Sequence, residues 1–290
     1  MPEAKSQSIP SDFPHPARVL RRYGLRAKKG LGQNFLVNLD LARRIVDLAA
    51  LPQGAKVVEL GVGLGILTKA LAERAARVIG YEIDQDLLQI LREEGLPPGV
   101  ELRQGDILAL DYHALAQELG ERLILFGNLP YYLSSRLLYK LFEERQAINW
   151  AVFMFQKEVA DRLLAGPGSK DYGPLSILLK LRARLTRLLV LSPAHFYPRP
   201  EVSSAVLKIE FDPSPLPQEE GLKHLLKVAF ASRRKKFVRN LVNAGWPKKE
   251  VEDALQELGL SKEVRAEEIP PENFLKLTQR LVPLKSPNHK

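Results

Sequence analysis

Short apolar runs recur through the first part of the chain, and stretches with helical periodicity separate them. Hydrophobic residues fill these runs without alternation, which is typical of strands buried on both faces of a sheet. Between the runs, apolar side chains recur every three or four residues, as at Leu41, Ile45 and Leu48, which indicates amphipathic helices. Strands alternating with helices predict an α/β fold with a mostly parallel sheet. The predicted strands are 57–60, 77–81, 100–103, 123–126 and 150–155.

The pattern changes toward the end of the chain. A strand is predicted at 205–211, and late strands without a helix between them suggest an antiparallel edge to the sheet; the strongly apolar stretch 175–191 is given no element. Prolines at 213, 215 and 217 then indicate a domain boundary. The later pattern is helical at 222–231, 235–242, 248–258 and 272–281. We therefore expect a basic, partly disordered arm at 1–27, an α/β domain at 28–212 and a helical domain at 213–290.

The chain has 290 residues and a net charge of +9, which favours a polyanionic partner. Basic residues gather before Gly30 and again between Val228 and Lys249, where there are seven basic residues and no acidic one. A solvated charged surface is one interpretation, and contact with RNA phosphates is the other. The residues predicted to contact RNA are Arg22, Lys28, Lys29, Arg233, Arg234, Lys235 and Lys236.

The composition excludes several kinds of chemistry. The chain has no cysteine, which excludes disulfides and catalytic thiols and fits a reducing compartment. No apolar run has the length of a membrane span and no signal peptide is evident, so we expect a cytoplasmic protein without a membrane partner. The five histidines are scattered without metal-binding spacing, so no metal site is expected.

Three glycines at alternate positions, Gly61, Gly63 and Gly65, follow the first predicted strand and its Glu59. Glycine lets a ligand approach the backbone, so this turn before a helix predicts a site for a nucleotide-like ligand. The dinucleotide fingerprint fails because Ile66 stands at its sixth position, and no Gly-Lys-Ser/Thr follows. The pattern resembles the first motif of S-adenosylmethionine-dependent methyltransferases; a tight turn without a ligand is the alternative.

Two acidic residues follow the next strands. Glu82 ends the second strand about twenty positions beyond the glycine turn, where such folds place a carboxylate on ribose hydroxyls. Asp106 follows the third strand, and its carboxylate can accept a hydrogen bond from the exocyclic amine of adenine. Asp84 begins the next helix and is interpreted as its N-cap.

Asn128, Leu129, Pro130 and Tyr131 end the fourth strand, at the sheet edge that carries the glycine turn. They resemble the motif of methyltransferases that modify exocyclic base amines. The N6 lone pair of adenine is delocalised into the ring, so acceptors for its two hydrogens favour a more pyramidal nitrogen. The Asn128 amide oxygen and the Leu129 carbonyl are the predicted acceptors, while Tyr131 offers a face for stacking. No general base is needed, because the proton can leave to water.

These motifs, taken in order, resemble the small-subunit ribosomal RNA adenine N6,N6-dimethyltransferase family, the kasugamycin-resistance methyltransferases. The resemblance extends from about Lys28 to about Asn240. Val62 and Tyr132 stand where many members have proline and asparagine. The resemblance also rests on Gly-Gln-Asn-Phe-Leu at 32–36, Gly105-Asp106, Gln156-Lys157-Glu158, Phe196 with its Pro-x-Pro neighbours, and Arg233-Arg234-Lys235.

The resemblance implies a Rossmann-like S-adenosylmethionine methyltransferase domain at 28–212 and a small all-helical RNA-binding domain at 213–290. It implies that Phe196 sandwiches the target adenine. The cofactor would be S-adenosylmethionine, bound by Asn34, Leu36, Gly61, Gly63, Glu82, Asp106 and Asn128. The implied catalytic set is Asn128, Leu129, Tyr131 and Phe196.

The implied activity is dimethylation of the N6 amines of two adjacent adenines in the 3′-terminal hairpin of 16S (small-subunit) ribosomal RNA. The implied partner is the immature 30S subunit, and a monomer is expected. The related large-subunit adenine methyltransferase is a close alternative. A noncatalytic RNA-binding assembly or transcription factor is a second, against which the intact Asn128 motif argues. A small-molecule methyltransferase is a third, and it would not need two basic clusters.

Overall fold

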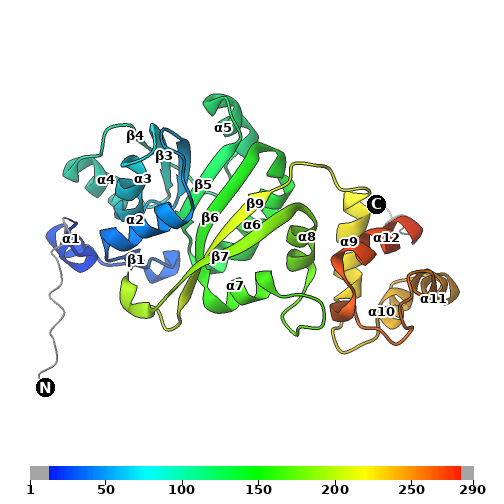
Figure 1. Cartoon of the computed structure of the whole chain (residues 1–290). Helices are drawn as coiled ribbons and strands as arrows, with labels where there is room; N and C mark the ends of the chain where they lie inside the picture. Colours follow the sequence, from blue (N-terminus) through cyan, green and yellow to red (C-terminus); the bar gives the residue numbers. More distant parts are fainter. Residues whose placement is uncertain (1–12, 282–290) are drawn as a thin grey trace, which may run out of the picture.

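A seven-stranded sheet forms the centre of the computed structural model, which describes residues 13–281 (Figure 1). Its strands follow the order β4-β3-β2-β5-β6-β9-β7, and the first five are mutually parallel. The predicted Rossmann-like α/β fold is confirmed, and parallel pairing brings the carboxyl ends of β2, β3 and β5 to one edge. The strands are β2 (Lys56–Leu60), β3 (Arg77–Glu82), β4 (Val100–Gln104), β5 (Leu123–Asn128), β6 (Ile148–Gln156), β7 (Ala183–Leu191) and β9 (Ser204–Phe211).

Helices cover both faces of the sheet. Successive residues of β5 enter opposite cores: Phe126 joins a hydrophobic cluster with α2 and α3, whereas Leu125 joins a cluster with α5, α6 and α8. The central strands β5 and β6 are therefore apolar along most of their length, as parallel strands buried on both faces are. No helix within 13–281 is long and apolar enough to cross a membrane. The helices are α2 (Leu39–Leu48), α3 (Ile66–Ala72), α4 (Gln85–Glu94), α5 (Tyr112–Leu119), α6 (Ser134–Glu143), α7 (Lys157–Leu164) and α8 (Pro174–Arg182).

The stretch 175–191, to which the sequence pattern assigned no element, divides into α8 and β7. β7 is an edge strand, and its exposed side chains include Arg184 and Thr186. Polar side chains on an edge discourage pairing with other chains. β9 pairs antiparallel with both β6 and β7, so the antiparallel strand lies next to the edge of the sheet.

The C-terminal helices pack at the opposite end of the molecule from α1 (Pro16–Arg22) (Figure 1). Their core is continuous with that of the sheet, because Phe237 and Phe274 share a hydrophobic cluster with Tyr172. Buried Arg145 pairs with Glu219 at 2.7 Å and joins α9 to the α/β part. The domain boundary after residue 212 stays a prediction. The expected helices are α9 (Glu219–Ala229), α10 (Phe237–Asn243), α11 (Lys248–Glu257) and α12 (Pro271–Arg280).

The N-terminal arm contains a helix, α1, within its described part. Pro16 stands in the first turn, where a missing N–H costs no helical hydrogen bond, and Val19 and Leu20 are buried. Farther on, β1 (Phe35–Leu36) pairs antiparallel with β8 (Phe196–Tyr197). This small sheet, which the sequence did not indicate, brings the Gly-Gln-Asn-Phe-Leu motif beside the Phe196 loop. Residues 1–12, the rest of the predicted arm, lie outside the described residues.

Candidate active site

The turn between β2 and α3 depends on its glycines. Gly61, Gly63 and Gly65 have φ angles of 77°, 61° and 80°, in the left-handed region that other residues rarely adopt. A Cβ on Gly63 would lie 3.1 Å from the Phe35 ring, so space is also limited. The Gly63 N–H donates to Glu82 Oε2 at 2.9 Å, which joins this turn to the end of β3.

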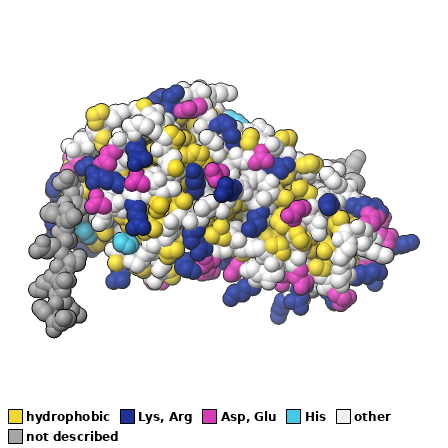
Figure 2. All heavy atoms as spheres, viewed as in Figure 1, with side chains coloured by type: hydrophobic (Ala, Val, Ile, Leu, Met, Phe, Trp, Pro, Cys, Tyr) yellow, Lys and Arg dark blue, Asp and Glu magenta, His cyan; other side chains and the backbone are white. Residues whose placement is uncertain are grey.

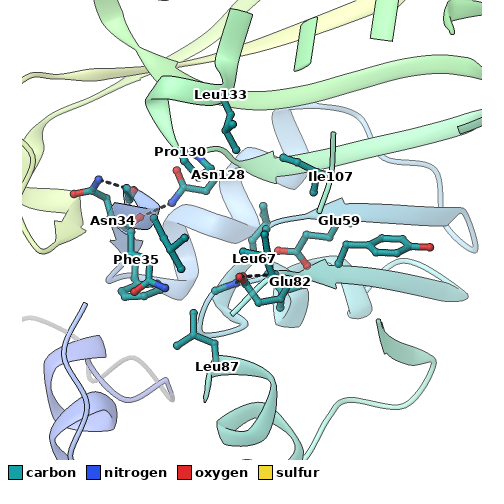
Figure 3. Close-up of a pocket in the computed structure, with 18 of the residues that line it drawn as sticks. Asn34, Phe35, Glu59, Leu67, Glu82, Leu87, Ile107, Asn128, Pro130 and Leu133 are labelled. Atoms are coloured by element: carbon teal, nitrogen blue, oxygen red, sulfur yellow. Dashed lines mark hydrogen bonds between the residues drawn. The ribbon is translucent and has the colours of Figure 1, made fainter. Parts of the chain in front are cut away.

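A cavity of about 280 Å³ opens at the carboxyl ends of β2, β3 and β5 (Figure 3). Open parallel sheets bind their ligands at this edge. Residues from distant segments meet there, and the roles assigned to them from the sequence stay predictions. The lining includes every predicted cofactor residue: Asn34, Leu36, Gly61, Gly63, Glu82, Asp106 and Asn128.

Glu82 lines the cavity from the end of β3 (Figure 3). Its Oε1 accepts the N–H groups of Ile83 and Asp84, each at 2.9 Å. Oε2 accepts only the Gly63 N–H among the described residues, so it keeps an acceptor position for a ribose hydroxyl. Burial raises the pKa of this carboxyl, while the backbone donors act in the opposite direction.

Glu59 is a further acid in the cavity, and no role was predicted for it from the sequence. It is 1% exposed, and its Oε2 has no hydrogen-bond partner among residues 13–281. Burial raises the pKa of Glu59 to about 8. Burying a carboxyl without a partner costs free energy. An acidic residue inside a strand that is buried on both faces was therefore the sequence feature that could have indicated a functional role for Glu59. Its position fits a cationic group, such as the ammonium of an amino acid.

Asn128 is held in one orientation by the N-terminal motif. Its Nδ2 donates to the Asn34 carbonyl at 2.6 Å (Figure 3). Asn34 is in turn held by a bond from its own Nδ2 to the Gly32 carbonyl at 3.1 Å. Because the amide nitrogen of Asn128 is engaged, its Oδ1 remains as an acceptor for a substrate amine.

Residues 28–36, which we call the strap, connect this amide to the cofactor side of the cavity. Lys28 Nζ lies 2.6 Å from Asp84 Oδ1, and Gln33 Nε2 donates to Asp84 Oδ2 at 2.7 Å. Asp84 is the N-cap of α4, as predicted, and its N–H is bound by Glu82. The far end of the strap is β1, paired with β8. The strap therefore joins the turn after Glu82 to the carbonyl that holds Asn128.

Leu129, Tyr131 and Phe196 do not line the cavity in this conformation. Leu129 is buried, and the Tyr131 hydroxyl lies 2.9 Å from Ser204 Oγ. The Phe196 side chain is 4% exposed and belongs to the hydrophobic cluster that contains Leu36. Their catalytic roles stay predictions.

The basic residues predicted to bind RNA differ in how free their side chains are. Figure 2 shows basic side chains projecting from the end of the molecule that the C-terminal helices form, interspersed with acidic ones. Lys29, Arg234 and Lys235 are exposed and have no partner within residues 13–281. The others are engaged: Arg22 with Glu94, Lys28 with Asp84, Lys236 with Glu263, and Arg233 with the carbonyls of Lys170 and Tyr172.

The protein is an S-adenosylmethionine-dependent methyltransferase. The features typical of this class are the glycine turn, the Glu82 carboxylate at the end of β3 and the cavity between them. Within that class, residues 24–282 match the family model for ribosomal RNA adenine dimethylase. The chain belongs to this family, and S-adenosylmethionine is its cofactor.

Named relatives cover almost the whole chain. Ribosomal RNA small subunit methyltransferase A of Syntrophus aciditrophicus is 39% identical over 91% of this chain and 97% of its own length. The protein of that name from Bacillus cytotoxicus is 37% identical over 92% and 95%. Among solved structures, a dimethyladenosine transferase from Plasmodium falciparum has a TM-score of 0.72 at 26% identity, covering 85% of this chain and 98% of that one. The 23S rRNA methyltransferase ErmE has a TM-score of 0.65 at 26% identity, covering 86% and 100%.

Proposed function

We propose that this protein dimethylates the N6 amines of two adjacent adenines in the 3′-terminal hairpin of small-subunit ribosomal RNA. The hydrogen bond from Asn128 Nδ2 to the Asn34 carbonyl carries the proposal, because it leaves the amide oxygen as an acceptor at the cavity. The relatives named ribosomal RNA small subunit methyltransferase A support the choice of substrate, since they match the chain over nearly its full length.

The residues of the chain position the amine that is methylated. S-adenosylmethionine supplies an electrophilic methyl group when it is bound. Asn128 Oδ1 and the Leu129 carbonyl accept the two N6 hydrogens, so the nitrogen becomes more pyramidal and its lone pair becomes more nucleophilic. Transfer would form a bond from this nitrogen to the methyl carbon and break the bond from that carbon to sulfur. The proton then leaves the cationic nitrogen to water, so catalysis consists of positioning and electrostatics.

Three acids of the cavity suit three groups of hydrogen-bond donors on the cofactor. Glu82 Oε2 accepts from ribose hydroxyls, and Glu59 accepts from the ammonium of the amino-acid end. Asp106 uses Oδ1 to accept the Leu108 N–H at 2.9 Å, which leaves Oδ2 for the amine of the cofactor's adenine. Glu59 Oε2 and Asp106 Oδ2 have no partner in the described part of the chain, and Glu82 Oε2 keeps an acceptor position beside the Gly63 N–H.

We also propose that Tyr131 and Phe196 stack on the target adenine. Phe196 is paired with Leu36 of the strap, so a shift of β1 and β8 on RNA binding would open its ring to the base. Phe196→Leu keeps most of the buried volume and removes the aromatic face. We expect it to slow transfer by about 5- to 150-fold, the equivalent of one lost stacking partner.

The proposed partner is the immature 30S subunit, and a cytoplasmic location follows from a ribosomal RNA substrate. The monomeric state expected from the sequence stays a prediction. Size-exclusion chromatography with light scattering, alone and with subunits, measures that stoichiometry.

Mass spectrometry of RNA tests the function. Small subunits that lack the modification are incubated with the protein and S-adenosylmethionine, and large subunits serve as the control. We expect two neighbouring adenines near the 3′ end of the small-subunit RNA to gain two methyl groups each. Methylation of large-subunit RNA instead, or of a different nucleotide, would contradict the proposed substrate.

A further inference from the structure

The beginning of α6 presents side chains that the described protein leaves partly exposed. Tyr132, in the 3₁₀ turn just before α6, is followed by Arg136 and Tyr139 at intervals of four and three residues. Side chains at these intervals lie on one side of a helix. Tyr132 and Arg136 both line the cavity, so this row begins at the cavity and continues along α6. We call these three residues the α6 row.

The exposed rings of the α6 row are unusual in this protein. Tyr132 is 58% exposed and Tyr139 is 37% exposed. Within residues 13–281, they are the only aromatic side chains among the large exposed hydrophobic ones. The other members of that group are aliphatic and belong to separate parts of the fold: Leu48, Ile83, Val190, Val202 and Val242. Exposed aromatic rings gathered beside a cavity indicate a binding surface.

Arg136 supplies a free positive charge between the two rings. Its side chain is exposed, and no carboxylate or carbonyl within residues 13–281 binds it. Lys140, one turn farther along α6, is by contrast paired with Glu144. Aromatic faces combined with a guanidinium are the means by which proteins hold single-stranded RNA, through base stacking and phosphate contact.

We propose that the α6 row binds the nucleotides that flank the target adenine, as a subsite for single-stranded RNA. Tyr132 and Tyr139 stack on bases, and Arg136 contacts the phosphate between them. The seven steps from Tyr132 to Tyr139 span about 10 Å along the helix, which is room for more than one stacked base. An RNA strand whose adenine enters the cavity must pass over its rim, where the row begins. The subsite rests on the proposed function, because it requires an RNA substrate at this cavity.

Variants of the α6 row distinguish a loss of this subsite from a loss of net charge and from a loss of folding. Tyr132→Ala and Tyr139→Ala should each weaken binding of unmodified small subunits by about 5- to 150-fold, and Tyr→Phe at either position should bind like the wild type. Arg136→Ala should lower the salt slope by about one, where the salt slope is the steepness with which the logarithm of the RNA-binding constant falls with the logarithm of the salt concentration. Arg44→Ala is the matched control, because Arg44 is exposed on α2, has no partner within 13–281 and lies outside the cavity lining. It should leave binding unchanged.

Three measurements on the same proteins decide the outcome: subunit affinity, single-turnover methyl transfer and cofactor affinity by calorimetry, at a temperature where melting curves show every variant folded. Cofactor affinity should not change. If the wild type methylates small subunits and the alanine variants bind them normally, the subsite is wrong while the proposed function stands. If Arg136→Ala loses cofactor affinity, Arg136 belongs to the cofactor and the subsite is also wrong. If the wild type does not methylate small subunits, the proposed function fails, and the subsite fails with it.

Discussion

At the cavity, Glu82 and Asn128 are fixed by hydrogen bonds, whereas the basic segment before α10 includes exposed side chains without partners. Glu82 is held by the N–H groups of Gly63, Ile83 and Asp84, and Asn128 is held by a carbonyl. Arg234 and Lys235 are exposed and unpaired within residues 13–281. Methyl transfer requires atoms at defined positions, but attraction to phosphates tolerates mobile charges. The two regions should therefore respond differently to substitution.

Lys28 shows that a positive charge alone does not tell whether a residue belongs to the hydrogen-bonded cavity or to the exposed surface predicted to bind RNA. Its sequence context predicted a phosphate contact, but its ammonium is bound by Asp84 and Asp86 at 2.6 and 2.7 Å. These bonds raise the pKa of Lys28, so its charge is retained and is directed at the two carboxylates. In this structure Lys28 helps to fix the strap, and with it the carbonyl that orients Asn128.

Removing the fixed amide should have the largest effect. Asn128→Ala should lower the single-turnover rate by about 10²–10³-fold at saturating cofactor and RNA, by analogy with the loss of one oxyanion-hole donor. RNA affinity should survive. Asn128→Asp is the control for orientation, because it keeps an acceptor but lacks the N–H that binds Asn34. We expect its rate to lie between those of the wild type and Asn128→Ala. Near-normal transfer by Asn128→Ala would eliminate the amide as the acceptor of the N6 hydrogens.

The buried acid Glu59 should make the stability of the free protein depend on pH. Its pKa rises from 4.5 to about 8 on folding, so the folded state holds a proton that the unfolded state has lost. Binding of this proton stabilises the folded state relative to the ionised form of Glu59. The contribution to the free energy of unfolding is complete below about pH 4.5 and decreases as the pH rises to 8, by at most about 1.4 kcal/mol per pH unit. Glu59→Gln cannot titrate, so its stability relative to the wild type should increase from pH 5 to pH 8. Urea unfolding measures this difference, and a constant difference would mean that Glu59 is already ionised.

Glu82→Ala tests the acid that is proposed to bind the ribose, through cofactor affinity. The ribose hydroxyls would lose an acceptor, at a cost of roughly 1.5–3 kcal/mol for bonds to a charged group. Glu82→Gln keeps an acceptor oxygen of similar shape and should lose less. Titration calorimetry with S-adenosylmethionine measures both variants. Unchanged affinity in Glu82→Ala would remove this carboxylate from the cofactor site.

The cavity could be located from the sequence because its residues follow strands. Glu82, Asp106 and Asn128 each stand at or just after the end of a predicted strand, and parallel strands bring such positions to one sheet edge. The glycine turn likewise has a local signature, since its backbone geometry excludes most other residues. No knowledge of the tertiary packing was needed to group these residues.

The contacts of the strap and the unpaired state of Glu59 could not be predicted from the sequence in the same way. The bond between Gln33 and Asp84, and the pairing of Phe35 with Tyr197, join segments far apart in the chain through tertiary contacts. Neither has a local sequence pattern. Glu59 was visible as a charge at the end of an apolar run, but its lack of a partner is a property of the folded core. The stretch 175–191 was ambiguous because leucines separated by arginines suit a helix and an edge strand equally.

Charge reversal at the exposed pair should have the smallest and most salt-dependent effect. Arg234→Glu with Lys235→Glu should weaken RNA binding, with cofactor affinity unchanged, and should reduce the salt slope by about two, one for each lost phosphate contact. Arg44→Glu with Arg92→Glu is the matched control, because these exposed residues on α2 and α4 change the net charge equally. RNA affinity measured between 50 and 200 mM salt compares the two proteins. An equal fall in slope would show that net charge alone attracts the RNA, and that the segment before α10 is no more specific than the rest of the surface.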